Sequence, residues 1–212
     1  MKSKTILSFA LISGILLMAG CATTKNYQKA EGISSSLEKT AQDINQSKVQ
    51  VGIVTSTLSS LVQAPSNNIK SQFEKFDSEL NKLDSLAEAL YAQSVSIQVE
   101  GSNYFKSWQQ DLATIKNEDI RTESTQRKLI MAERFETVRT NYEKAKVDLS
   151  FFLSNLKDIR TALSSDLRAE GIESVKGATR DSQAHAKQLQ RTLGHLSVDY
   201  KELSTSMSTN SR

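Results

Sequence analysis

Apolar residues recur at steps of three and four along most of the chain, and this repeat constrains the fold more than any other feature of the sequence. Its clearest run consists of Phe135, Val138, Tyr142, Ala145, Leu149, Phe152, Leu156, Ile159 and Leu163. Such spacing places apolar side chains on one face of an α-helix, whereas a half-buried strand alternates apolar and polar residues. Only one proline and eight glycines occur among the 212 residues, so little interrupts helix formation. The pattern predicts an all-α protein.

The first two helical segments are separated by the only proline. The first segment covers residues 27–63 and ends before Pro65, because proline cannot continue a helix. The second covers about residues 69–115.

The weakest stretch of the second segment runs from Ser94 to Gly101, where apolar residues alternate as they would in a short strand. A kink or a close contact with another helix at Gly101 agrees better with the surrounding repeat.

The third and fourth segments begin after a polar turn and a glycine. We expect Asn117 to close the second helix in a left-handed conformation and Asp119 to cap the third. Gly171 is expected to end the third helix. The fourth segment carries apolar residues from Val175 to Met207, with small polar residues at the repeat positions in its first half, so we expect loose packing there.

These segments are long compared with the turns between them. Helices of about 37 to 50 residues would be ~55 to 75 Å long, and short connections favour antiparallel neighbours. We therefore predict an elongated antiparallel helical bundle or coiled coil of three or four long helices. It would be a single domain over residues 27–209, followed by a frayed tail at 210–212. An extended coil that completes its core by self-association remains an alternative.

The N-terminus has the features of an export signal. Two lysines in the first four residues precede an apolar run of about 13 residues, which as a helix would rise only ~20 Å against a hydrocarbon core of ~30 Å. A basic start, a short apolar stretch and small residues after it are typical of a signal peptide. Loss of Lys2 and Lys4 with this segment leaves a nearly neutral chain, which gives no indication of a nucleic-acid partner.

The sequence Met18-Ala19-Gly20-Cys21 resembles the lipobox of bacterial lipoproteins and contains the only cysteine. The resemblance implies acylation of Cys21 by chains such as palmitate and cleavage between Gly20 and Cys21. Residues 1–20 would then be a lipoprotein signal peptide, and residues 21–26 a lipid anchor and short linker. Ala22, rather than aspartate, follows the cysteine, which by the sorting rule of such lipoproteins implies the periplasmic face of a Gram-negative outer membrane.

Two alternatives for this N-terminus remain. The segment could be an ordinary cleaved signal in which Cys21 is incidental, or it could be a retained transmembrane helix. The position of the single cysteine favours the lipid anchor over both.

Residue types that carry chemistry are sparse and scattered. His185 and His195 lie ten residues apart on one predicted helix, ~15 Å along its axis, so they cannot share a metal. Asp181 and His185 form an i,i+4 pair without an evident third ligand. The serine-rich stretches lack a nearby base, and no glycine-rich phosphate loop occurs. We therefore predict no metal, no cofactor and no catalytic site.

Two phenylalanines lie just beside the apolar repeat. Phe105 neighbours the repeat positions Tyr104 and Trp108, and Phe151 neighbours Phe152. Their placement favours a core widened by further helices. The functional alternative is an exposed aromatic patch, formed by Phe105 and Phe151, for a protein or lipid partner.

The region between residues 104 and 174 carries a pattern beyond the bare repeat. It consists of Trp108, Ser124, Arg134, Phe135, Tyr142, Ala145, Phe152, Leu153, Leu156 and Leu163, followed by Gly171-Ile172-Glu173-Ser174. In these residues the chain resembles an uncharacterised family of proteobacterial helical lipoproteins, a domain of unknown function. The resemblance implies a lipobox followed by long helices and supplies no catalytic residues.

Together these features predict a non-enzymatic structural or protein-interaction module of the cell envelope, held at the membrane through Cys21 and facing an envelope protein partner. An amphiphile-binding bundle is the alternative, because Ser94, Gly101, Thr179 and Ser182 leave the apolar repeat poorly filled. An enzyme is the third and weakest class.

Overall fold

The computed structural model describes residues 25–63, 65 and 68–208. Its elements are α1 (Asn26–Gln63), α2 (Ile69–Thr114), α3 (Glu118–Ser165), α4 (Ala169–Ser174) and α5 (Lys176–Met207). The all-α prediction is confirmed, and the stretch from Ser94 to Gly101 is helical within α2. The predicted signal peptide, the cleavage site at Gly20 and Cys21, and the tail at 210–212 lie outside the described residues.

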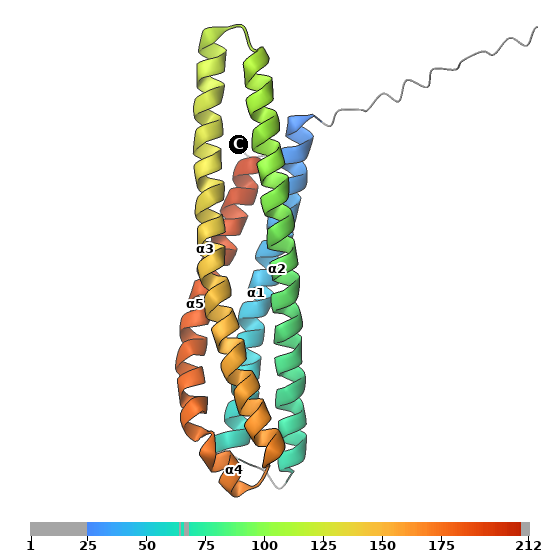
Figure 1. The fold of residues 1–212 in the computed structure, drawn as a ribbon, viewed down its shortest axis with the longest axis vertical. Coiled ribbons are helices and arrows are strands. Elements are labelled where there is room, and N and C mark those ends of the chain that lie inside the picture. Colours follow the sequence, from blue (N-terminus) through green and yellow to red (C-terminus); the bar gives the residue numbers. More distant parts are fainter. Residues whose placement is uncertain (1–24, 64, 66–67, 209–212) are drawn as a thin grey trace, which may run out of the picture.

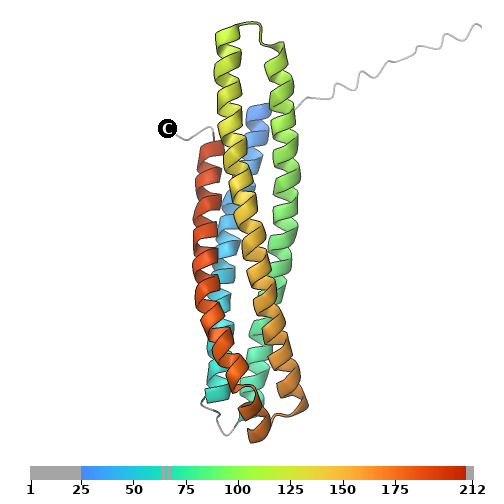
Figure 2. The same cartoon turned by 60° about the vertical axis from the view of Figure 1, so that its left-hand side comes forward.

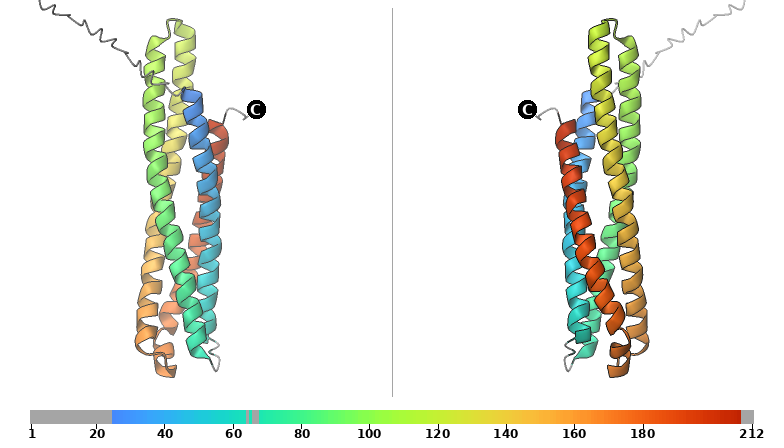
Figure 3. Two further views of the ribbon diagram at one scale, coloured as in Figure 1. Left: turned by 90° about the vertical axis from the view of Figure 1, so that its right-hand side faces the viewer. Right: turned by 90° about the vertical axis from the view of Figure 1, so that its left-hand side faces the viewer.

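Four long helices form an elongated antiparallel bundle (Figures 1 and 2). α1 and α3 each pack against both α2 and α5, so each pair, α1 with α3 and α2 with α5, lies across a diagonal of the bundle. The short helix α4 lies at the turn between α3 and α5. The start of α1, the end of α5 and the α2–α3 connection all lie towards the same end of the bundle (Figure 3).

The apolar repeat forms the core of this bundle. Leu37, Ile44, Val51 and Leu58, spaced seven residues apart on α1, are at most 1% exposed. The predicted repeat residues of α3 are likewise buried. Removing this apolar surface from water supplies the main favourable free energy of folding, because each fully buried leucine or valine contributes about 1.5–3 kcal/mol.

A row of polar side chains holds α5 against α1 at steps of seven residues. On α5 the donors are Gln183, Gln190, Ser197 and Ser204, and their respective acceptors lie on Ser59, Lys48, Ala41 and Ser34 of α1. One pairing is reciprocal: the Ser204 hydroxyl donates to the Ser34 carbonyl at 2.8 Å, and the Ser34 hydroxyl donates to the Ser204 carbonyl at 2.9 Å. The two serines, Ser197 and Ser204, reach backbone carbonyls of α1 directly, so their small side chains allow the two helices to approach closely there.

Two predicted helix boundaries were wrong. Asn117 is the N-cap of α3 rather than a left-handed C-cap: its φ is −73°, and its side-chain oxygen accepts from the Ile120 N–H at 3.0 Å. Asp119 accordingly lies in the first turn of α3. The first N–H groups of a helix have no acceptor within the helix, and the Asn117 side chain satisfies one of them, that of Ile120. This N-cap stands in place of the expected left-handed turn.

The third predicted boundary was also wrong, because α3 ends at Ser165 and Gly171 lies inside α4. A side chain at Gly171 would collide with the backbone carbonyl of Asp166, whose carbon would lie 2.9 Å from the added Cβ. The glycine therefore permits the tight passage from α3 into α4 rather than marking the end of a helix.

The predicted close helix contact at Gly101 is confirmed. A Cβ atom built at this position would lie 2.7 and 2.8 Å from two ring carbons of Phe135 on α3. Phe135 is 8% exposed and packs edge-on against Phe105 with ring centroids 5.7 Å apart, so the ring has little room to retreat. Glycine at this position therefore allows α3 to lie close to α2.

We expect Gly101→Ala to lower the free energy of unfolding. Overpacking a core costs about 1–3 kcal/mol, which exceeds the ~0.5–1 kcal/mol that alanine gains over glycine within a helix. Gly32→Ala is the matched control, because nothing lies within 4 Å of the Cβ that it adds to α1, and it should stabilise the protein. Urea unfolding followed by circular dichroism measures both changes. A Gly101→Ala protein as stable as Gly32→Ala would contradict the contact.

Candidate functional site

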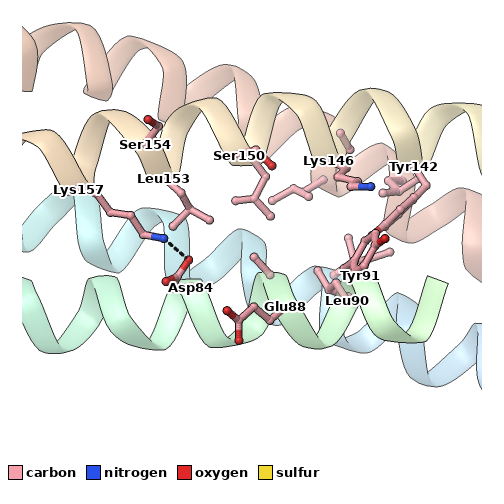
Figure 4. A pocket seen from close by; sticks show the side chains of 16 residues that line it. Asp84, Glu88, Leu90, Tyr91, Tyr142, Lys146, Ser150, Leu153, Ser154 and Lys157 are labelled. Carbon is pink, nitrogen blue, oxygen red and sulfur yellow. Dashed lines mark hydrogen bonds and ion pairs between the residues drawn. The ribbon is translucent and has the colours of Figure 1, made fainter. Parts of the chain in front are cut away.

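A groove with a volume of about 570 Å³ lies between α2 and α3 (Figure 4). Ile44 of α1 and Leu193 and Leu196 of α5 also line it, so the groove reaches inward to the core of the bundle. Small-molecule sites commonly have volumes of about 300–1,000 Å³ and mostly apolar linings with a few polar groups. The groove has both properties.

Two small side chains of the apolar repeats line the groove. Ala87 on α2 and Ala145 on α3 occupy core-facing positions where leucines occur elsewhere in the same repeats, and both line the groove. Leu90, Leu149 and Leu153 form its apolar walls. The two helices therefore meet above and below this level and leave space between them.

Two contacts between α2 and α3 bound the mouth of the groove. The Lys146 ammonium lies 4.2 Å from the centroid of the Tyr91 ring, and the Lys157 ammonium lies 2.7 Å from an Asp84 carboxylate oxygen. Along α3 these lysines are separated by ~16 Å, and along α2 their partners are separated by ~10 Å. Figure 4 shows the lysines on α3 reaching towards α2 at either end of the opening.

Few polar groups remain available at the mouth itself. Ser150 and Ser154 are exposed on the α3 side, and Glu88 is exposed on the α2 side. Among the described residues Glu88 has no ion-pair partner, whereas Asp84 is engaged by Lys157. The α3 side therefore offers hydroxyl groups and the positive charge of Lys146, and the α2 side offers a free carboxylate.

A buried polar cluster adjoins the end of the groove nearest Tyr91. Tyr142, which lines the groove, and Tyr200 of α5 are 5% and 2% exposed and both hydrogen bond with Ser94 of α2. Burial raises the pKa of Tyr142 well above its usual range and raises the pKa of Tyr200 to about 12, while the bonds to Ser94 oppose this shift. Both phenols are therefore neutral at physiological pH.

The cluster explains the weak stretch of the second helical segment. Ser94 interrupts the apolar repeat because its hydroxyl interacts with Tyr142 of the neighbouring helix α3 and with Tyr200 of the diagonal helix α5.

The two phenylalanines of the predicted aromatic patch lie in different places. Phe105 is partly buried and packs against the core, with Tyr104 and Phe135 as ring neighbours. Phe151 is 55% exposed on α3, and its ring centroid lies 5.3 Å from that of His185 on α5. Phe135 and Phe151 are ~24 Å apart along α3, so Phe105 and Phe151 do not form one continuous surface.

The histidines and the small polar repeat positions do not converge on the groove. In the described part of the chain, no group of three or more His, Cys, Asp or Glu residues could hold a metal ion. Thr179 and Ser182 are each 1% exposed, and their hydroxyl groups have no hydrogen-bond partner among the described residues. They lie on α5 outside the groove lining.

Sequence reasoning did not identify the groove. Its residues belong to the same apolar repeat as the rest of the core, and the only local signal is alanine at 87 and at 145. That signal becomes meaningful only once both positions are known to line the same space between α2 and α3.

Comparison with known proteins places the chain in one family. No curated protein and no solved structure matches it significantly. In the described residues, no helix has the length and hydropathy needed to cross a membrane. The family model described as protein of unknown function (DUF2959) matches residues 22–205, which include almost the entire helical bundle. The chain therefore belongs to the DUF2959 family.

Proposed function

We propose that this protein is a lipid-anchored module of the cell envelope that acts by binding a single-chain amphiphile between α2 and α3. The anchoring part of the proposal is supported by the export signal and by the lipobox-like sequence ending in Cys21, which together suggest the periplasmic face of the outer membrane. The binding part is supported by the groove, and no catalytic step is proposed.

The dimensions of the groove favour a small ligand over a partner helix. A helix with its side chains is ~10–12 Å across, so it could enter only by separating Tyr91 from Lys146 and Asp84 from Lys157. A hydrocarbon chain is thinner and could lie along the apolar walls with both contacts intact. The proposal rests on one observation: the two α2–α3 contacts leave room in the groove for a hydrocarbon chain but not for a helix.

The polar groups at the mouth suggest how the ligand is oriented. Its chain would contact Leu90, Leu149 and Leu153, and its polar end would lie towards α3. There the hydroxyls of Ser150 and Ser154 can form hydrogen bonds and Lys146 can attract a negative charge. An anionic end would be repelled where it approaches the Glu88 carboxylate on the α2 side.

Binding of a dansyl-labelled fatty acid tests this proposal. The chain from residue 22 onwards lacks both the apolar N-terminal run and the acylation site, so titration of the probe reports on the bundle alone. We expect saturable fluorescence enhancement with one probe per chain. Ala87→Phe should fill the groove and weaken binding by at least about tenfold, which corresponds to ~1.4 kcal/mol.

Ala92→Phe is the matched control, because Ala92 is exposed on the same helix and does not line the groove. It adds the same side chain to α2 and should leave the affinity for the probe nearly unchanged. Equal affinity of the Ala87→Phe and Ala92→Phe proteins would exclude the groove as the site. Absence of saturable binding by the parent protein would exclude amphiphile binding altogether.

A second candidate function is binding of an envelope protein by the outer face of the bundle. Phe151 and Val147 are one helical turn apart on α3 and are 55% and 66% exposed, and His185 adjoins the phenylalanine. Exposed apolar side chains at such spacing suit contact with a partner helix, including one from a second copy of this chain. In that case the bundle would act as a rigid spacer that presents this face away from the membrane.

A further inference from the structure

The α2–α3 hairpin extends beyond the other two helices at one end of the bundle (Figure 1). The start of α1 lies beside Asp111 of α2, because the Asn26 side-chain amide donates to the Asp111 carboxylate at 2.5 Å. The end of α5 lies beside Arg134 of α3, whose guanidinium donates to the Ser206 hydroxyl at 3.0 Å. Residues 112–133 therefore form a projection made of two helices, which we call the hairpin tip.

The hairpin tip lies at the end of the bundle where α1 begins. Four residue steps separate Cys21 from Lys25, the first described residue, and a fully extended chain spans at most ~14 Å over that distance. From the level of Asp111, the three remaining residues of α2 advance the tip by ~4.5 Å at the helical rise per residue. An upright bundle would therefore bring the end of α2 to within ~10 Å of the depth of Cys21, even with the linker fully extended.

That remaining distance is only slightly larger than the thickness of the lipid headgroup layer. The hydrocarbon core of a bilayer is ~30 Å thick and the whole bilayer ~40–45 Å, which leaves ~5–7 Å of headgroups on each side. A linker that is ~5 Å shorter than its fully extended length would place the tip within this layer.

The side chains at the tip suit such an environment. Ile120, in the first turn of α3, is 56% exposed, and Ile115 in the connection is partly exposed. Lys116 lies between them in sequence and can extend its charge towards phosphate groups, whereas Arg121 is paired with Glu118 and the Ile115 carbonyl. Tyr27 at the start of α1 is 53% exposed at the same end of the bundle. Apolar side chains mixed with a tyrosine and cations are typical of segments at a membrane interface.

We infer that the hairpin tip contacts the lipid headgroups of the membrane that holds Cys21, so that the bundle stands on the bilayer at two points. This inference rests on the proposed acylation of Cys21. Because acidic residues such as Glu118 and Asp119 accompany the cations, the contact depends on the depth of the isoleucines and does not require anionic lipids.

Depth-dependent quenching tests this inference on the acylated full-length protein. Cys21 is the only cysteine of the chain, and acylation blocks its sulfur, so an introduced cysteine can be labelled selectively with an environment-sensitive fluorophore. Ile120→Cys places the label on the tip. Ser165→Cys places it at the exposed far end of α3, ~68 Å away along the helix. Val147→Cys, 66% exposed, places it on the side of the bundle.

Each labelled protein is reconstituted into phosphatidylcholine vesicles with and without headgroup spin-labelled lipid. Quenching at residue 120 should exceed quenching at residues 147 and 165 by at least about threefold, because only the tip lies at headgroup depth. Quenching at 147 or 165 that equals quenching at 120 would overturn the inference and indicate a bundle lying flat. Absence of quenching at 120 in protein that sediments with the vesicles would also overturn it but leave the anchor intact. Protein that does not sediment with the vesicles would overturn both the inference and the proposed anchor.

Discussion

Replacing Cys21 with serine is expected to transfer the protein from the membrane fraction to the soluble fraction. The proposed anchor requires a thioether at the cysteine sulfur, which serine cannot form, so a Cys21→Ser protein from which residues 1–20 have been removed has no remaining hold on the bilayer. A single acyl chain holds a protein only marginally at a bilayer, whereas several hold it firmly, so the loss should be nearly complete. Fractionation of cells at high salt followed by immunoblotting measures this distribution, and mass spectrometry of the intact protein tests for the acyl chains.

Ala22→Asp is a suitable control, because it leaves the cysteine in place. By the sorting rule that the resemblance implies, this variant should remain acylated and membrane-bound but should collect in the inner membrane. Tight membrane association of the Cys21→Ser protein would contradict the lipid anchor and would favour the alternative of a retained transmembrane helix.

Replacing Leu156 with aspartate is expected to unfold most of the bundle. Leu156 lies on α3 and is 0% exposed, so the substitution both removes a packed side chain and places a carboxylate where no water or cation can reach it. The loss of packing alone costs about 2–5 kcal/mol, and the buried charge adds to it. Because domains of this size are stable by only about 5–15 kcal/mol, the melting temperature should fall sharply or the cooperative transition should disappear. Thermal unfolding followed by circular dichroism measures the effect.

Ser154→Asp introduces the same carboxylate two residues earlier on the same helix, at an exposed position. Surface substitutions usually change stability by less than about 0.5 kcal/mol, so this variant should melt close to the parent protein. Equal melting temperatures for the Leu156→Asp and Ser154→Asp proteins would show that α3 is not packed against the other helices as described.

The helices themselves could be predicted from the sequence because their signals are local. Leu37, Ile44, Val51 and Leu58 are buried at the predicted seven-residue spacing, and Pro65 separates α1 from α2 as expected. The close contact at Gly101 was also readable, since a glycine within a long apolar repeat indicates an approach by another helix. At Asn117 and Gly171 the local signal was real but ambiguous. An asparagine can cap either end of a helix, and a glycine can end a helix or allow another chain segment to pass.

Properties that depend on which helices are neighbours could be decided only by the tertiary structure. Phe105 and Phe151 have similar sequence surroundings, yet Phe105 meets Phe135 across the α2–α3 interface and is partly buried, whereas Phe151 faces outwards. The groove is lined by Ala87 and Ala145, which come from segments almost sixty residues apart in the sequence. The relative lengths and offsets of all four long helices decide at which end of the bundle the hairpin tip projects. The sequence by itself determined that long amphipathic helices form, because apolar periodicity is a property of each segment alone. The tertiary structure decided where those helices leave a cavity or an exposed side chain, because burial is a property of pairs of segments in contact.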